Sequence, residues 1–422
     1  MRILICGADG MVGHALSTAL AQAGHQIMRG VRRPRLDGDR LADFRAQHSP
    51  DQWRTLVQGC DVVINAVGIL REQQSGDFSA IHTDAPQALF LAAAQQGVQQ
   101  IIQISALGAD LGGTAYFRSK LAADRYLLEY LAPAFPQLRC TVLRPSLIFS
   151  AQGASSQLLM GLASLPVLVV PHLPDAGLQP LHIDDLCTAV VQLCGSEQVP
   201  AIAELAGPER KTLESLLLAY RALLGQAPAP VIRLPAGLAA AGAWCAQWLP
   251  SSALTPDSWH MLQQGSATER NALPALCKRP LRRVSDFLPV ATVSAIAAQV
   301  REKSVLSVHR IVLAMIWLIT AGLSAGLAPL EDSLALLSPL GLSGNSAVLA
   351  LFAAALLDAG FGLATLLRPG KRLWRMQAGL IVFYSIVIGL FLPAFWLHPF
   401  GPVLKNLAVL SLLLHLYMAE PS

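Results

Sequence analysis

The pattern of apolar and polar positions divides the chain into two parts. Over the first 300 or so residues, short β-branched runs alternate with Ala-rich stretches of helical spacing, which predicts a Rossmann-type α/β fold with a doubly wound parallel sheet. The first strands are expected at Ile3–Cys6, Gln26–Val31, Asp61–Ala66, Ile101–Ser105 and Cys140–Pro145. Helices are expected over Met11–Ala23, Ala85–Gln96 and Tyr116–Tyr130. Residues 1–150 are assigned to the Rossmann core and residues 151–300 to a small substrate lobe.

The last quarter of the chain is apolar almost throughout. Four stretches are each close to the ~17–25 residues that a spanning helix needs: residues 311–327, 347–367, 376–397 and 403–418. Residues 305–419 are therefore predicted to form a four-helix transmembrane bundle.

Composition agrees with this division. The 422 residues are 53% hydrophobic and 14% charged, whereas a soluble protein carries ~25% charged residues. A net charge of +4 without Lys/Arg blocks argues against a nucleic-acid partner. The seven cysteines precede the apolar quarter and form no C-x-x-C pair or metal-ligand spacing, so no metal site is predicted and a reducing compartment is expected.

Charges around the apolar stretches predict an orientation. Lys and Arg flank the first stretch and fill the link between the second and third: Arg301, Lys303, Arg310, Arg368, Lys371, Arg372 and Arg375. Glu331 and Asp332 follow the first stretch. Loops rich in Lys and Arg stay in the cytoplasm. An integral inner-membrane protein is predicted, with both termini and the α/β part cytoplasmic and the opening residues a strand rather than a signal peptide.

A glycine-rich turn follows the first expected strand. In Gly7-Ala-Asp-Gly10-Met11-Val12-Gly13, glycines permit a tight turn and close approach of the backbone, and the following helix offers free N–H groups to a pyrophosphate. The spacing G-x-x-G-x-x-G predicts a dinucleotide site, the alternative being a purely structural turn.

The residues after the second strand bear on the choice of cofactor. An NAD-binding site usually places an acidic residue there, to bind the ribose 2′-hydroxyl. This chain has Arg32 and Arg33, which suit a 2′-phosphate. NADP(H) is therefore preferred and NAD(H) remains open, the alternative being that both arginines belong to a solvated turn.

Three further residues suggest proton transfer. Tyr116 and Lys120 are four apart and share a helix face, so the ammonium is expected to lower the phenol's pKa, while Ser105 at a strand end would orient a carbonyl or alcohol. The alternative is an idle structural helix.

These motifs resemble the extended or atypical short-chain dehydrogenase/reductase superfamily, and in particular proteins related to the NAD(P)-binding accessory subunit of respiratory complex I. The resemblance covers about residues 1–300 and includes Asp61–Gly68, Ile104–Gly108, Leu143–Ser146 and Gln179–Leu186. It implies that Gly7, Gly10 and Gly13 bind pyrophosphate and that Tyr116, Lys120 and Ser105 are catalytic. It also implies that Asn65, Ala66, Val67 and Gly68 line the adenosine ribose and that Pro145 and Ser146 border the nicotinamide.

The apolar quarter resembles the DoxX-like four-helix membrane family, through Ile316–Gly322, Leu356–Gly362 and Trp396–Asn406. That family is associated with quinone-linked redox chemistry. Asp358 falls inside the second stretch, where an ionised carboxylate is costly and is expected to face a partner. The candidate partners are Tyr384, His398, Lys405 and Asn406, the alternative being a protonated Asp358 that only joins helices.

Three functions are compatible with these features. The first is a membrane-anchored NADP(H)-dependent oxidoreductase of the short-chain dehydrogenase/reductase type, acting on a quinone, lipid carbonyl or other lipid-linked substrate from the bilayer. The second is a non-catalytic NADP(H)-binding scaffold or assembly factor in the membrane. The third is a sugar epimerase or dehydratase. The sequence identifies no protein partner.

Overall fold

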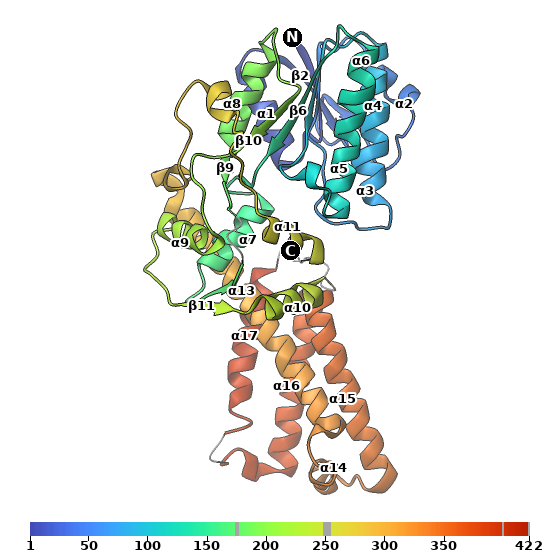
Figure 1. Ribbon diagram of the computed structural model, residues 1–422. Coiled ribbons are helices and arrows are strands. Elements are labelled where there is room, and N and C mark those ends of the chain that lie inside the picture. The colour runs from blue at the N-terminus through green and yellow to red at the C-terminus, as the bar shows by residue number, and fades with distance from the viewer. Residues whose placement is uncertain (174–176, 248–254, 399–400, 421–422) are drawn as a thin grey trace. The chain divides into compact units, whose positions relative to one another are not determined.

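The chain folds into two compact units, residues 1–300 and 301–422, each described here by itself. The computed structural model describes residues 1–173, 177–247, 255–398 and 401–420 (Figure 1).

The first unit is built on a seven-stranded sheet, which confirms the predicted fold class. All its strand pairs are parallel, in the order β10-β6-β5-β4-β1-β2-β3. The strands are β1 Arg2–Cys6, β2 Gln26–Val31, β3 Asp39–Leu41, β4 Val62–Asn65, β5 Gln100–Ile104, β6 Arg139–Pro145 and β10 Ile202–Leu205. The order reverses between β1 and β4, and ligands of doubly wound sheets bind at this point, beyond the carboxyl ends of the strands.

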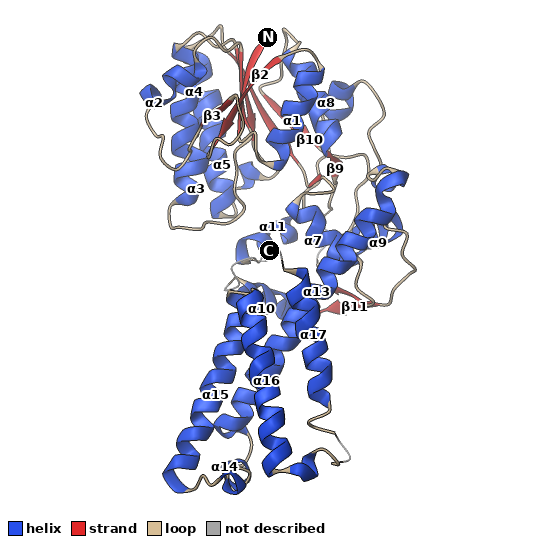
Figure 2. Cartoon of the chain, turned by 180° about the vertical axis from the view of Figure 1, so that it is seen from behind, coloured by secondary structure: helices blue, strands red, loops and turns tan. Residues whose placement is uncertain are grey.

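Helices cover both faces of the sheet (Figures 1 and 2). Alternate residues of β1 enter opposite cores, Ile3 and Ile5 one and Leu4 and Cys6 the other. The first core is closed by α1 Met11–Gln22, α8 Ile183–Cys194 and α12 Leu273–Cys277. The second is closed by α2 Pro50–Val57, α4 Ala85–Gln95 and α5 Ala115–Arg125, which continues as the π-helical η3 Tyr126–Leu131 and α6 Ala132–Ala134. Two short helical segments, α3 Asp77–Ser79 and η1 Ala80–Asp84, precede α4, and the 3-10 turn η2 Ala109–Leu111 precedes α5.

A third core lies around Phe149, Tyr220 and Phe287. Its elements are α7 Ala154–Ala163, α9 Leu213–Leu223 and η4 Val284–Asp286, with the paired strands β8 Leu168–Pro171 and β11 Val231–Leu234, and β7 Ile148–Phe149 and β9 Leu181–His182. Helices α10 Ala236–Ala246 and α11 Pro256–Gln264 follow β11. Residues after 150 belong to two cores. Helices α8 and α12 and strand β10 pack in the core of the seven-stranded sheet, and α7, α9 and η4 pack in the third core.

The second unit is helical. Its elements are α13 Val290–Gly322, which begins in the first unit, η5 Leu323–Leu327, α14 Leu330–Ala335, η6 Ser338–Leu340, α15 Gly344–Leu367, α16 Lys371–Phe391, η7 Pro393–Phe395 and α17 Lys405–Ala419. Three helices in the described chain are long and apolar enough to cross a membrane: Val290–Leu327, Gly344–Leu367 and Lys371–Phe391. The predicted fourth span is a helix of only 15 residues, shorter than the ~17 that usually span.

The second unit buries polar side chains and exposes apolar ones. Thr365 and Gln377 are fully buried, whereas Leu349, Leu356 and Leu390 are more than 70% exposed. This distribution suits a lipid environment, in which exposed leucine side chains contact lipid tails and polar groups are buried between helices.

Candidate functional site

The glycine-rich turn lies between β1 and α1 and forms a cradle that side chains would fill. Gly7 has φ +80°, and a Cβ on Gly13 would lie 2.1 Å from the Gly7 carbonyl oxygen. Gly10 caps α1, whose first-turn N–H groups have no partner earlier in the helix. Met11, half exposed, and Val12, partly buried, begin this turn. The cradle therefore fits a dinucleotide pyrophosphate.

Three loops meet at the reversal point of the sheet. The Gly7 and Ala8 amides donate to the Gly30 oxygen of β2 at 2.8 and 3.2 Å. A Cβ on Gly7 would approach Val67 Cγ2, after β4, to 3.0 Å. The loop after β1 thus contacts the end of β2 and the loop after β4, at the carboxyl ends of these strands.

The Asn65–Gly68 segment divides into a buried anchor and a surface. Asn65 is 1% exposed, its Nδ2 donates to Gln103 Oε1 at 2.8 Å, and its Oδ1 accepts from the Val67 amide at 3.1 Å. Ala66 and Val67 are half-buried and Gly68 is exposed. Asn65 therefore shapes the loop, and the next three residues are those able to touch a ligand.

Arg32 and Arg33 follow β2 directly and are exposed. Within the described chain neither side chain has an ion pair, whereas Arg29 binds Asp39 at 2.9 Å. The pKa of the Asp39 carboxyl is lowered, first by the Arg35 backbone N–H and then by Arg29. Two uncommitted guanidinium groups therefore stand beside the glycine cradle.

Tyr116 and Lys120 lie on α5, which Thr114 caps by accepting the Phe117 amide at 3.2 Å. Lys120 Nζ donates to the carbonyl oxygens of Val67 and Ile104, at 3.0 and 3.2 Å, which leaves its third N–H for a ligand. Burial lowers the pKa of Lys120 to about 8, against the opposing effect of Asp124. The ammonium is thereby fixed at the ends of β4 and β5.

The expected lowering of the phenol's pKa is wrong. Tyr116 is 8% exposed, among Phe78, His82 and Phe117. Burial, together with the Asp124 carboxylate, raises its pKa to about 12. Tyr116 is thus a neutral phenol at physiological pH.

Ser105 follows β5 but serves a different group from the one predicted. Its Oγ donates to Asp124 Oδ2 at 2.8 Å, and Arg144 Nε donates to the same oxygen at 3.3 Å. The Ser105 hydroxyl proton is thus committed to Asp124. The catalytic role of Ser105 stays a prediction.

His82, on η1, is a site residue that sequence reasoning missed. It is 1% exposed, its Nε2 accepts from the Ile69 amide at 3.0 Å, and its Nδ1 lies 2.9 Å from Ser119 Oγ. Burial and Lys120 lower its pKa to about 2. A neutral His82 therefore holds the loop after β4 against α5, a role that no motif or spacing indicated.

Pro145 and Ser146 end β6 and are buried. The Pro145 oxygen accepts from the Leu107 amide at 2.9 Å, and Ser146 Oγ donates to the Gln179 oxygen. Both residues join neighbouring segments to the end of β6.

In the second unit the structure brings some of the candidates together. Asp358 lies near Thr320 and interacts electrostatically with Tyr384. Asn406 Nδ2 donates to Ser385 Oγ at 2.9 Å. His398 stacks on Phe395 at 6.2 Å between ring centroids, and Lys405 is exposed at the start of α17.

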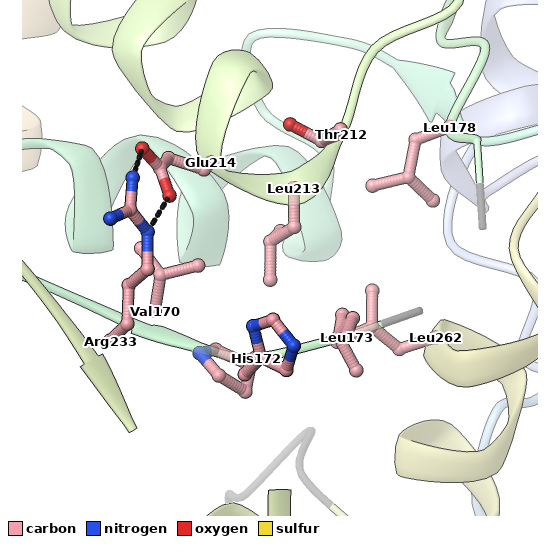
Figure 3. A pocket seen from close by; sticks show the side chains of 10 residues that line it. Val170, His172, Leu173, Leu178, Thr212, Leu213, Glu214, Arg233 and Leu262 are labelled. Atoms are coloured by element: carbon pink, nitrogen blue, oxygen red, sulfur yellow. Dashed lines mark hydrogen bonds and ion pairs between the residues drawn. The ribbon is translucent and has the colours of Figure 1, made fainter. Parts of the chain in front are cut away.

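A separate cavity of about 140 Å³ lies in the small lobe (Figure 3). One wall is a bidentate ion pair in which Arg233 donates twice to Glu214 at 2.8 Å. The other lining residues are Val170, Pro171, His172, Leu173, Leu178, Thr212, Leu213 and Leu262. No group of three or more His, Cys, Asp and Glu residues among those described could hold a metal ion.

Comparison with known families matches both parts of the chain. Residues 7–161 match the NAD(P)H-binding family. Residues 314–414 match the DoxX-like family.

Among curated proteins, the chain is 26% identical over 230 residues to subunit 9 of the NADH dehydrogenase [ubiquinone] 1 alpha subcomplex, mitochondrial, of Mus musculus, and 25% identical to that of Rattus norvegicus. Each match covers 50% of this chain and 58% of the relative's length. The chain thus spans somewhat over half of these relatives.

Solved structures share the fold. The gox2253 structure aligns with a TM-score of 0.54 at 19% identity, over 72% of this chain and 98% of that one. UDP-N-acetylglucosamine 4-epimerase from Bacillus cereus aligns with a TM-score of 0.52 at 14% identity, over 71% and 96%. MoeE5, in complex with UDP-glucose and NAD, aligns with a TM-score of 0.52 at 16% identity, over 72% and 100%.

Proposed function

Since the chain joins an NAD(P)-binding, short-chain dehydrogenase/reductase-like Rossmann domain to a C-terminal DoxX-like domain, we propose that it is a membrane-anchored, NADPH-dependent reductase of a lipophilic acceptor, such as a quinone or a lipid carbonyl. Bound dihydronicotinamide would supply a hydride to the acceptor. The residues of this chain must bind the cofactor and supply the proton that the reduced acceptor takes up.

The observation that carries the proposal is the position of Lys120 beside the glycine cradle. Its Nζ bonds the carbonyls at the ends of β4 and β5, and a Cβ on Gly68 would lie 3.1 Å from it. A cation here, with one N–H to spare, suits a ribose hydroxyl. Tyr116, one helical turn earlier on α5, is a neutral phenol that can donate the proton a reduced carbonyl oxygen takes up.

NADPH is the proposed cofactor because Arg32 and Arg33 are exposed and uncommitted where a 2′-phosphate would lie. The lipophilic acceptor is proposed because three helices of the same chain suit a bilayer. The Lys/Arg-rich link between α15 and α16 supports a cytoplasmic location for the nucleotide domain.

A binding-only NADP(H) module is the second candidate, favoured by Ser105. With its hydroxyl committed to Asp124, the three-residue catalytic set is incomplete. The curated relatives are named as subunits of a larger assembly, which fits a stabilising role for bound cofactor.

The test uses the full chain in lipid nanodiscs. NADPH should bind at least tenfold more tightly than NADH, with Arg33→Ala reducing this preference. Short-chain ubiquinone or a long-chain aldehyde should support NADPH oxidation. Tyr116→Phe should remove turnover and spare binding, whereas Tyr126→Phe, at the start of η3, should spare both. NADPH binding without oxidation by either acceptor class would favour the binding-only module.

A further inference from the structure

Asp358 is the one acidic residue of α15, α16 and α17. It is 8% exposed, and its Oδ1 is buried without a hydrogen-bond partner among the described residues. A carboxylate with an open hydrogen-bonding position inside an apolar helical unit is unusual, because polar groups there normally find partners.

No cation among the described residues pairs with Asp358 to balance a negative charge. From α13, Thr320 lies near the carboxyl group, but its hydroxyl donates to the Ile316 and Trp317 oxygens at 2.9 Å. From α16, the titratable neighbour is Tyr384. From α17, Asn406 binds Ser385, the residue after Tyr384. No ion pair reaches Asp358 in the described chain. Arg310 and Arg375 precede Thr320 and Tyr384 by ten and nine residues, about 15 and 13 Å of helix.

We propose that Asp358 is a proton-binding site, and that it exchanges its proton with only one membrane face, the face at which α17 begins. A proton requires no cavity, and a neutral carboxyl group removes the charge that this setting disfavours. The proposal goes beyond nicotinamide chemistry, because it holds whether or not the first unit reduces anything.

Toward the opposite end, where α15 ends and α16 begins, a row of hydrogen bonds closes the interior to protons. Trp317 Nε1 donates to Gln377 Oε1 at 2.9 Å, and Gln377 Nε2 donates to Thr365 Oγ1 at 2.8 Å. Indole and amide N–H groups donate hydrogen bonds but do not take up a proton in exchange. Phe361, Trp374 and Ile381 are packed in the same core, so this row acts as a seal.

Toward the start of α17, the polar side chains are less enclosed, and two of the three carry hydroxyl groups. Tyr384, Ser385 and Asn406 are all half-buried. Hydroxyl groups both donate and accept hydrogen bonds. A proton leaving the Asp358 oxygen can therefore move to the Tyr384 oxygen or to a water molecule, while the tyrosine or the water releases its own proton toward the α17-start face. Uptake reverses these steps, and no electron moves.

The test exploits dicyclohexylcarbodiimide, which modifies protonated carboxyl groups in apolar surroundings. The full chain is reconstituted in sealed, orientation-sorted liposomes, and the Asp358 peptide is followed by mass spectrometry while the pH of one face is changed at a time. We expect labelling at neutral pH, slowed at least fivefold when the pH is raised on the α17-start face and unchanged when it is raised on the other face.

Matched variants test the path. Tyr384→Phe should slow the response of labelling to pH at least threefold, and Asp358→Asn should remove the adduct. Leu363→Ala, at an exposed position of the same helix as Asp358, should leave the response unchanged. Absence of the adduct, labelling insensitive to both faces, or control by the other face would each overturn the proposal.

Discussion

Gly13→Ala tests the cofactor cradle most directly. The added methyl carbon would lie 2.1 Å from the Gly7 oxygen, 2.6 Å from the Gly7 carbonyl carbon and 3.0 Å from Ala8 Cα. All three contacts are backbone atoms, so no side-chain rotation relieves them. Because ordinary contacts begin at 3.4 Å, the turn must move by about 1.3 Å (3.4 less 2.1).

That movement has a definable cost. Overpacking a close-packed position costs about 1–3 kcal/mol. The Gly7 oxygen also accepts the Gly10 amide at 2.9 Å, and losing this bond adds about 1 kcal/mol. The turn can relax around the new methyl group while no cofactor is bound, but it must return to its original shape to bind the pyrophosphate. The total cost of about 2–4 kcal/mol then weakens NADPH affinity about 30- to 1,000-fold.

The assay is NADPH titration of the full chain in nanodiscs, alongside thermal unfolding. Gly195→Ala is the matched control, because its Cβ would meet only the Gln192 oxygen at 3.8 Å. We expect the control to bind like the parent. A Gly13→Ala variant with parental affinity and stability would refute the assignment of this turn as the pyrophosphate cradle.

Three further predictions concern other parts of the chain. Ser105→Ala should lower the unfolding free energy by about 1–3 kcal/mol, because Asp124 loses a buried donor, yet retain at least a third of any turnover; complete loss of turnover with retained stability would reinstate Ser105 as catalytic. Acidification should destabilise the first unit. The pKa of His82 is about 2 in the folded state and 6.5 in the unfolded state, so between these pH values the unfolded state binds more protons. The free energy of unfolding should therefore fall by about 1.4 kcal/mol per pH unit below pH 6.5. Chemical denaturation of His82→Gln across this range should lack that component, and an unchanged slope would contradict it. A reporter active only in the cytosol should be silent when fused at Leu342, between the first two apolar helices, and activity there would reverse the predicted orientation.

The elements that sequence predicted well are those whose signal is local. A short apolar run, three glycines and helical periodicity predicted the β1–turn–α1 unit. The bounds of β4, β5 and β6 agree with the predicted bounds to within one or two residues. The edge strands β3 and β10 were missed because β3 has one apolar residue in three and β10 is interrupted by Glu204, whereas β4 opens with the continuous apolar run Val-Val-Ile.

Residues whose roles depend on distant partners could not be assigned from sequence. Ser105 turns to Asp124 because Arg144, from β6, makes that carboxylate a strong acceptor. His82 is buried because η1 packs on α5, and nothing around it in sequence marks this. The predicted fourth span, residues 403–418, agrees closely with α17, which begins at Lys405 and has 15 residues.

The environment of Tyr116 favours one direction of hydride chemistry. Reducing a carbonyl requires a group that holds a proton, and a phenol with a pKa of about 12 holds one at neutral pH. Oxidising an alcohol requires the phenolate, which the raised pKa disfavours at neutral pH. Lys120 lowers that cost only weakly, because two of its N–H groups already bind backbone carbonyls. Any activity of the full chain should therefore be reductive near neutral pH, with alcohol oxidation rising about tenfold per pH unit under alkaline conditions. Comparable rates in both directions at pH 7 would mean that ligand binding rearranges Lys120 toward the phenol.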